Sequence, residues 1–187
     1  MPVTRLVPLI LVSVMIVVEI YASRLRRADA PTRDRGSLIA IWGLIGVGYW
    51  AAFALWGLAR PPGPLLGAWA LWSGAVAAAA GIALRVWSIA TLGRYFTYVV
   101  KMTPDQKVVE TGPYRLLRHP SYAGAWLTGI GIGFSLGYAL APLIIGATQL
   151  AGYSIRMAVE EKALADGIGE PYRAYMTRTK RLIPFIW

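Results

Sequence analysis

The 187-residue chain contains no cysteine and only one histidine, His119. The absence of cysteine excludes disulfides, thiolate metal sites and cysteine nucleophiles, and we predict no metal centre. No Gly-x-Gly-x-x-Gly follows a strand in a βαβ unit, so the sequence does not support a Rossmann nucleotide-binding fold. Any cofactor pocket must therefore be of another type.

Charged residues are also scarce. They form 15% of the chain, against about a quarter in soluble domains, whereas 57% of the residues are hydrophobic and the mean hydropathy is +0.52. A helix of about 20 apolar residues spans the hydrocarbon layer, and the chain offers five such runs: 6–22, 38–59, 65–89, 122–140 and 141–159. We therefore predict an all-α polytopic membrane protein with five transmembrane helices in a single domain.

The first run has one feature of a secretory signal peptide, because Arg5 precedes it. Glu19 near its end, and arginines in place of a small-residue cleavage site, favour a retained helix. Segment 24–35 then carries five arginines, as expected of a short solvated loop.

The net charge of +10 is unevenly distributed along the chain. Of the 19 Lys and Arg residues, Arg5 and Arg60 fall on the side of the amino terminus, and the other 17 lie in or beside segments 23–37, 90–118 and 162–187. The positive-inside rule therefore predicts an outer amino terminus and a cytoplasmic carboxyl terminus, in a prokaryotic inner membrane or its equivalent. The basic excess indicates topology and contact with anionic membrane lipids, and we predict no nucleic-acid partner.

Two polar clusters stand beside the apolar runs. Residues 111–122 read Thr-Gly-Pro-Tyr-Arg-Leu-Leu-Arg-His-Pro-Ser-Tyr, directly before the fourth run, and Arg156, Glu160 and Glu161 stand at the end of the fifth. Ionisable residues in or beside a bilayer are costly and usually functional. The two clusters together are the predicted active site.

The spacing of glycines on the fourth run predicts that the two clusters lie close together. Gly129, Gly133 and Gly137 recur every four residues on the fourth run, a ridge typical of close helix packing in membranes. An antiparallel hairpin with the fifth run would bring the start of one helix beside the end of the other. The ridge is equally compatible with packing between chains, so the oligomeric state stays open.

Simpler interpretations remain for two of these residues. Arg156 and Glu160 have the spacing of an intrahelical ion pair, which is compatible with a role in the site. His119 precedes Pro120 at a helix start and in that position would face lipid headgroups.

The motifs resemble those of the isoprenylcysteine carboxyl methyltransferase family of integral membrane methyltransferases. The resemblance rests on the string 112–122 with Gly124, on Arg156 with Glu160 and Glu161, on Gly-Glu-Pro-Tyr at 169–172 with Tyr175, and on Ile-Pro-Phe at 183–185. It covers roughly the carboxyl-terminal half. The first two helices match only as hydrophobic spans.

The resemblance implies methyl transfer from S-adenosylmethionine to a lipophilic small molecule or a lipid-attached substrate, most readily at a carboxylate. It implies three transmembrane helices in 1–91 and a catalytic part in 92–187, with a cytoplasmic loop, a two-helix hairpin and a carboxyl-terminal cofactor-binding cap. Arg156 takes the position of the family's substrate-contacting, catalytic arginine. The implied cofactor-binding residues are Lys101, Gln106, Lys107, Val108, Val109, Tyr114, His119, Pro120, Ser121, Tyr122 and Glu160.

Two other functions are weighed against methyl transfer. Membrane sterol-type reductases, which use NADPH, resemble the same carboxyl-terminal pattern and are the second enzyme hypothesis. A small transporter would place its charges near the middle of its helices, whereas Glu19, Arg85, Arg156 and Glu160 lie toward one side. Transport is therefore disfavoured.

Overall fold

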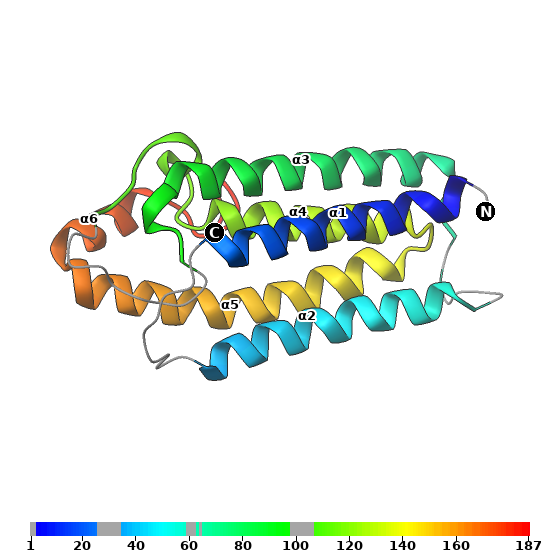
Figure 1. Cartoon of the computed structure of the whole chain (residues 1–187), viewed down its shortest axis with the longest axis horizontal. Helices are drawn as coiled ribbons and strands as arrows, with labels where there is room; N and C mark the ends of the chain where they lie inside the picture. Colours follow the sequence, from blue (N-terminus) through cyan, green and yellow to red (C-terminus); the bar gives the residue numbers. More distant parts are fainter. Residues whose placement is uncertain (1–2, 26–34, 59–62, 64, 98–106) are drawn as a thin grey trace.

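The computed structural model describes residues 3–25, 35–58, 63, 65–97 and 107–187. They form six α-helices and two short 3-10 turns (Figure 1). The α-helices are α1 (Val3–Leu25), α2 (Arg35–Trp56), α3 (Ala68–Leu92), α4 (Pro120–Ser135), α5 (Leu140–Ile168) and α6 (Glu170–Arg178), and the turns are η1 (Gly93–Tyr95) and η2 (Gly112–Arg115). Across these residues there are isolated bridges but no β-strand, which confirms the all-α prediction.

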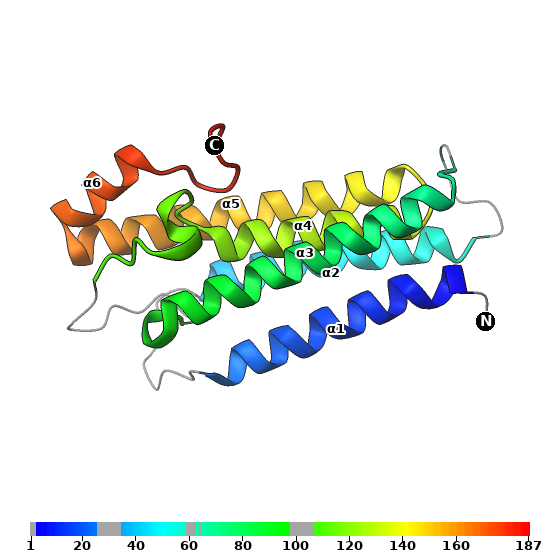
Figure 2. The ribbon, with the colours of Figure 1, turned by 90° about the horizontal axis from the view of Figure 1, so that it is seen from above.

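The five long helices lie side by side along one axis and alternate in direction (Figure 1). The tightest packing joins α3 to α4 and α2 to α5, and α4 to α5 comes next. Helix α1 rests mainly on α3 at the edge of the bundle (Figure 2). The last helix, α6, lies at the end of the bundle where α3 and α5 finish and α4 begins, and this end holds the site.

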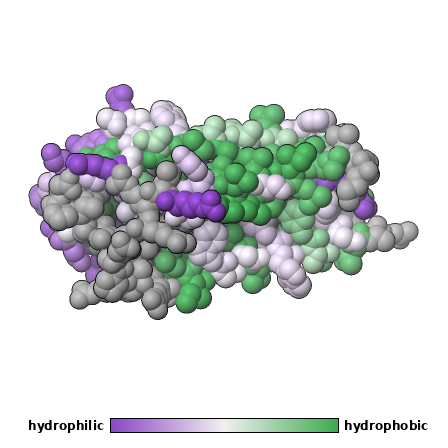
Figure 3. Space-filling model, in the orientation of Figure 1, coloured by the Kyte–Doolittle hydropathy of each residue, from purple (hydrophilic) through white to green (hydrophobic). Residues whose placement is uncertain are grey.

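The described residues contain three helical spans long and apolar enough to cross a membrane, Thr4–Arg24, Leu38–Trp56 and Ala68–Tyr95. Many of their large hydrophobic side chains face outward, among them Val17, Trp50 and Val76. On the face shown in Figure 3, hydrophobic residues cover most of the middle, and hydrophilic ones gather near the α6 end. The protein is therefore an integral membrane protein.

Helix α4 is shorter than its apolar run. It has 16 residues and ends at Ser135, so the expectation of a helix to residue 140 is wrong. The chain turns at Gly137, whose φ of 80° suits glycine and whose carbonyl oxygen accepts a hydrogen bond from the Leu66 N–H at 2.8 Å. The prediction that Gly137 shares a helical ridge with Gly129 and Gly133 is therefore wrong, because Gly137 lies beyond the end of α4.

Helix α5 is longer than its apolar run. It has 29 residues and continues to Ile168, nine residues past the predicted end of the run. The chain reverses at Gly169, with φ 79°, and enters α6. Arg156, Glu160 and Glu161 consequently belong to one continuous helix.

The rest of the ridge, Gly129 and Gly133, packs on α5 of the same chain, as the predicted hairpin requires. A Cβ added to Gly129 would collide with the Gln149 side chain, and one added to Gly133 would lie 2.5 Å from the Cα of Pro142, both on α5. On α3, a Cβ on Gly81 would lie 2.5 Å from the Gly124 carbonyl oxygen of α4. Small residues thus let α4 lie between α3 and α5 at close range.

Candidate active site

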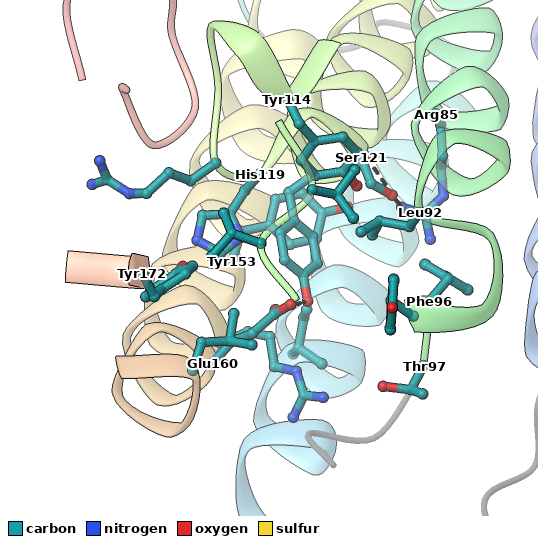
Figure 4. Close-up of a pocket in the computed structure, with 18 of the residues that line it drawn as sticks. Arg85, Leu92, Phe96, Thr97, Tyr114, His119, Ser121, Tyr153, Glu160 and Tyr172 are labelled. Carbon is teal, nitrogen blue, oxygen red and sulfur yellow. Dashed lines mark hydrogen bonds between the residues drawn. The ribbon is translucent and has the colours of Figure 1, made fainter. Parts of the chain in front are cut away.

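A pocket lies at the α6 end of the bundle, bordered by the end of α3, the start of α4 and the end of α5 (Figure 4). One part of its wall is rich in polar residues: Tyr95, Thr97, Lys107, Tyr114, Arg118, His119, Ser121, Tyr122, Tyr153, Arg156, Glu160, Tyr172 and Tyr175. Apolar residues complete that part: Leu92, Phe96, Val108, Val109, Leu164 and Ile168. The other part comes from the membrane helices: Met15, Glu19, Leu38, Ile41, Trp42, Ile45 and Arg85.

Most residues expected in the site line this pocket: Lys107, Val108, Val109, Tyr114, His119, Ser121, Tyr122, Arg156 and Glu160. Pro120 is buried and opens α4 without lining the pocket. Lys101 and Gln106 lie outside the described residues. The two sequence clusters therefore meet in space, although their cofactor and substrate roles stay predictions.

The start of α4 is fixed by local sequence and by the carboxyl-terminal tail. His119 caps the helix and Pro120 takes its first turn, where the missing N–H costs nothing and the fixed φ is already helical. The backbone N–H groups of Arg118 and His119 donate to the carbonyl oxygens of Lys180 and Arg181, at 2.7 and 3.0 Å. The tail thereby holds the motif loop in place.

His119 is buried, with 4% of its surface exposed. The interpretation in which it faces lipid headgroups is therefore wrong. Its Nε2 lies 3.2 Å from Glu161 Oε1, and its ring packs 5.7 Å from the Tyr122 ring. The Glu161 carboxylate therefore engages Nε2 of the ring.

Glu161 connects α5 to the motif loop before α4 and to the carboxyl-terminal tail. Its carboxylate accepts hydrogen bonds from Arg118 Nε at 2.8 Å and from the Arg181 guanidinium, in addition to the His119 contact. Burial raises the pKa of this carboxyl, but hydrogen bonds from His119, Arg181 and Arg118 outweigh it and lower the pKa to about 2. Glu161 is thus a charged anchor for the α4 start and the tail.

Glu160 is the adjacent residue, but it faces the pocket. Its Oε2 accepts a hydrogen bond from the Tyr122 hydroxyl at 3.0 Å, and Tyr122 in turn accepts one from Arg156. Arg156 is almost completely buried. Tyr122 thus links a carboxylate and a guanidinium across the hairpin, and it packs on Tyr153 with ring centroids 5.1 Å apart.

Helix α6 contributes two buried tyrosines, Tyr172 and Tyr175, to the polar wall of the pocket. The Tyr175 hydroxyl donates to the carbonyl oxygens of Tyr114 and Leu117, at 2.7 and 3.1 Å. Burial raises the pKa of both Tyr172 and Tyr175, so each phenol remains a neutral donor at physiological pH. The helix is therefore tied directly to the motif loop.

Sequence reasoning missed one part of the wall. Arg85 of α3 and Glu19 of α1 form an ion pair beside Ser121, yet neither was expected in the site. The available signal was a charge inside each of two apolar runs, since such charges usually pair and serve a function. A single sequence does not reveal that the two charges face each other.

Fold and site together define a class: an integral membrane helical bundle with a ligand pocket at one end, whose polar wall continues into an apolar one. A family model described as the isoprenylcysteine carboxyl methyltransferase family matches residues 74–166. The chain belongs to this family. The matched segment contains α4, most of α3 and most of α5.

Named relatives agree with that assignment. The chain is 30% identical over 108 residues to protein-S-isoprenylcysteine O-methyltransferase B of Arabidopsis thaliana, covering 57% of this chain and 55% of the relative. It is 34% identical over 104 residues to protein-S-isoprenylcysteine O-methyltransferase of Saccharomyces cerevisiae, covering 54% and 44%. The chain thus spans about half the length of the curated relatives it matches.

A solved structure of a eukaryotic intramembrane Ras methyltransferase, an isoprenylcysteine carboxyl methyltransferase, is also similar. It matches with a TM-score of 0.55 and 28% sequence identity, over 80% of this chain and 51% of that one. The likeness therefore extends beyond the segment matched by the family model.

Proposed function

We propose that this protein is an S-adenosylmethionine-dependent membrane methyltransferase that acts on a lipophilic acceptor, most readily at a carboxylate. The observation that carries the proposal is the meeting of His119 and Tyr122 with Arg156 and Glu160 in one pocket. Family membership supports the same chemistry. It also favours methyl transfer over reduction by NADPH.

The polar wall fits the donor by the chemistry of its groups. The Glu160 carboxylate, oriented by Tyr122, suits an ammonium or ribose hydroxyl through charge-assisted hydrogen bonds. His119 and Ser121 add ring and hydroxyl groups, and Tyr114 adds an aromatic face. We also retain Lys107, Val108 and Val109, which line the pocket, as cofactor contacts.

Bound S-adenosylmethionine would supply a methyl group already activated by a positive sulfonium, so the chain needs no covalent nucleophile and mainly aligns the two reactants. Arg156 presents a rigid donor fork that matches a carboxylate and keeps it ionised. The bound donor would give up its methyl group to a carboxylate oxygen, with the carbon–sulfur bond broken and a carbon–oxygen bond formed, so that the products would be a methyl ester and a neutral thioether.

The acceptor's apolar body is assigned to the wall supplied by α1 and α2. Leu38, Ile41, Trp42 and Ile45 of α2 face Met15 of α1 around the pocket. Such a wall suits a lipophilic molecule that enters from the bilayer, while the water-soluble donor enters from the polar end. The relatives' names refer to isoprenylcysteine, and a prenylated carboxylate is the first acceptor to try.

We further propose that α4 and α5 also cross the membrane, giving five spans, with an outer amino terminus and a cytoplasmic α6 cap. The length of α5 supports this topology if the bilayer boundary falls before Glu160. Helix α4, with 16 residues, is shorter than a full span and is placed in the bilayer by its close packing between α3 and α5. The alternating helix directions and the polar α6 end agree with it.

Two substitutions separate the proposed roles. Glu160→Ala is expected to weaken binding of S-adenosylhomocysteine, measured by calorimetry in lipid nanodiscs, roughly 10- to 100-fold, as for loss of a hydrogen bond to a charged group. Arg156→Ala is expected to leave most of that binding and to depress methyl transfer from radiolabelled S-adenosylmethionine to a prenylated carboxylate or a lipid extract.

Lys162→Ala provides the matched control, because Lys162 is exposed on the same helix. It should change neither binding nor transfer. Normal methylation by both Glu160→Ala and Arg156→Ala would refute the site assignment. Tight NADPH binding by a wild-type protein that ignores S-adenosylhomocysteine would favour the reductase instead.

A further inference from the structure

Glu19 and Arg85 form an ion pair that the proposed chemistry does not use. Arg85 Nε lies 2.5 Å from Glu19 Oε1, and Arg85 Nη2 donates to Glu19 Oε2 at 2.7 Å. The two side chains, of Arg85 and Glu19, are only 10% and 14% exposed. Taking both charges out of water costs several kcal/mol per ion before their attraction is counted, so a pair inside apolar helices calls for a functional explanation.

Arg85 also contacts a predicted site residue. Its Nη1 donates to Ser121 Oγ at 2.9 Å and to the Ser121 carbonyl oxygen at 3.2 Å. Because Ser121 Oγ accepts this bond, its own hydrogen is available to donate. Ser121 lines the pocket, and Figure 4 shows it beside Arg85. A bound ligand can therefore receive that hydrogen.

The other end of the pair holds α1. This helix packs mainly on α3 and only lightly on α4, and only 11% of its most apolar stretch is buried inside the protein. Met15 and Glu19 nevertheless line the pocket. The two-contact, largely buried ion pair between Glu19 and Arg85 is therefore a main attachment of α1 to the site.

We propose that Glu19 is a positioning residue: by holding Arg85 it orients the Ser121 hydroxyl toward the pocket and fixes α1 as part of the pocket wall. The first helix then belongs to the functional site, although it lies outside the segment matched by the family model. The identity of the ligand that Ser121 meets rests on the proposed function.

The first test is a double-mutant cycle on binding of S-adenosylhomocysteine. Glu19→Gln is expected to weaken binding about three- to tenfold, the effect of one misplaced hydrogen bond. In a Ser121→Ala background the same change should have no further effect. Equal losses in both backgrounds, or no loss in either, would overturn the proposed route through Ser121.

A packing control separates positioning from general destabilisation. Ala22 is buried on α1 at 1% exposure, so Ala22→Val disturbs the seat of the helix without removing a charge. It should lower the melting temperature and, because the Glu19–Arg85 pair still holds Ser121, weaken S-adenosylhomocysteine binding less than Glu19→Gln does. If it weakens binding as much as Glu19→Gln does, a positioning role for Glu19 is contradicted.

A second readout does not require the proposed cofactor. The chain lacks cysteine, so spin labels on Val17→Cys and Val76→Cys, both at outward-facing positions, report the α1–α3 distance cleanly. Glu19→Gln should broaden the distance distribution. An unchanged distribution would overturn the anchoring of α1, whereas failure of the wild type to bind S-adenosylhomocysteine would refute the proposed function and leave this readout to decide the inference.

Discussion

Two adjacent carboxylates at the end of α5 have different surroundings. Glu161 is 3% exposed and contacts Arg118, His119 and Arg181, whereas Glu160 meets the pocket through Tyr122. Successive residues on a helix point about 100° apart, so only one of the two faces the ligand. The structure assigns anchoring to Glu161, and we assign ligand binding to Glu160.

Glu161 gives the protein a defined acid sensitivity. Folding lowers the pKa of its carboxyl from the ordinary value of 4.5 to about 2, so its stabilisation is complete above about pH 4.5 and is lost as the pH falls toward 2. That lowering corresponds to about 3 kcal/mol. Thermal unfolding followed from pH 7 to pH 2 should show the loss.

Glu161→Gln tests the assignment. The variant should melt at a lower temperature than wild type at pH 7, and its melting temperature should depend less on pH between 4.5 and 2. Glu170→Gln is the control, because Glu170 is exposed at the start of α6. A Glu161→Gln protein with wild-type stability at pH 7 would contradict the anchoring role.

At the scale of single residues, the sequence predicts much of the site. The motif at 112–122 and the pair Arg156 and Glu160 can be recognised because unusual residue types stand beside apolar runs. The Glu19–Arg85 pair cannot be recognised in the same way, because its members are 66 positions apart and pair only once α1 is seated on α3. The separate orientations of Glu160 and Glu161 likewise depend on packing.

At the scale of elements, hydropathy located the long helices but not their ends. Apolar composition continues through the turn at Gly137, so it did not show that α4 ends at Ser135. It also stops before α5 does, because the last turns of α5 carry charged residues and pack on the cap. Helix ends are set by backbone hydrogen bonds and positive φ values, which a hydropathy pattern does not register.

Close packing of α3 on α4 makes a prediction for Gly81. Gly81→Ala places a Cβ about 2.5 Å from both the Gly124 carbonyl oxygen and the Thr128 N atom, so the two helices must separate. The expected cost is about 1–3 kcal/mol, with a lower melting temperature in detergent and weaker S-adenosylhomocysteine binding because Ser121 lies on α4.

Gly46→Ala on α2 is the matched control. A Cβ there meets nothing within 4 Å, and alanine has the higher helix propensity, so its melting temperature should equal or exceed that of wild type. Equal stability of the Gly46→Ala and Gly81→Ala proteins would contradict the close contact between α3 and α4.

At the scale of the whole molecule, the site extends beyond the segment matched by the family model. Residues 74–166 supply the hairpin with its two polar clusters, whereas α1, α2 and α6 complete the pocket wall. The helical membrane fold and the meeting of the hairpin ends were predictable from composition and glycine spacing. The contribution of α1 and α2 was not, because apolar spans of this kind carry no sequence mark of which pocket they face.

The central claim is that one pocket between the α4 start and the α5 end binds S-adenosylmethionine. Ultraviolet cross-linking of the purified protein with methyl-tritiated S-adenosylmethionine, followed by peptide mapping, tests it most directly. Label is expected in peptides spanning 107–122 or 153–161, removed by excess S-adenosylhomocysteine and strongly reduced in Glu160→Ala at the same concentration of S-adenosylmethionine. Labelling confined to other segments, or labelling that S-adenosylhomocysteine does not reduce, would contradict it.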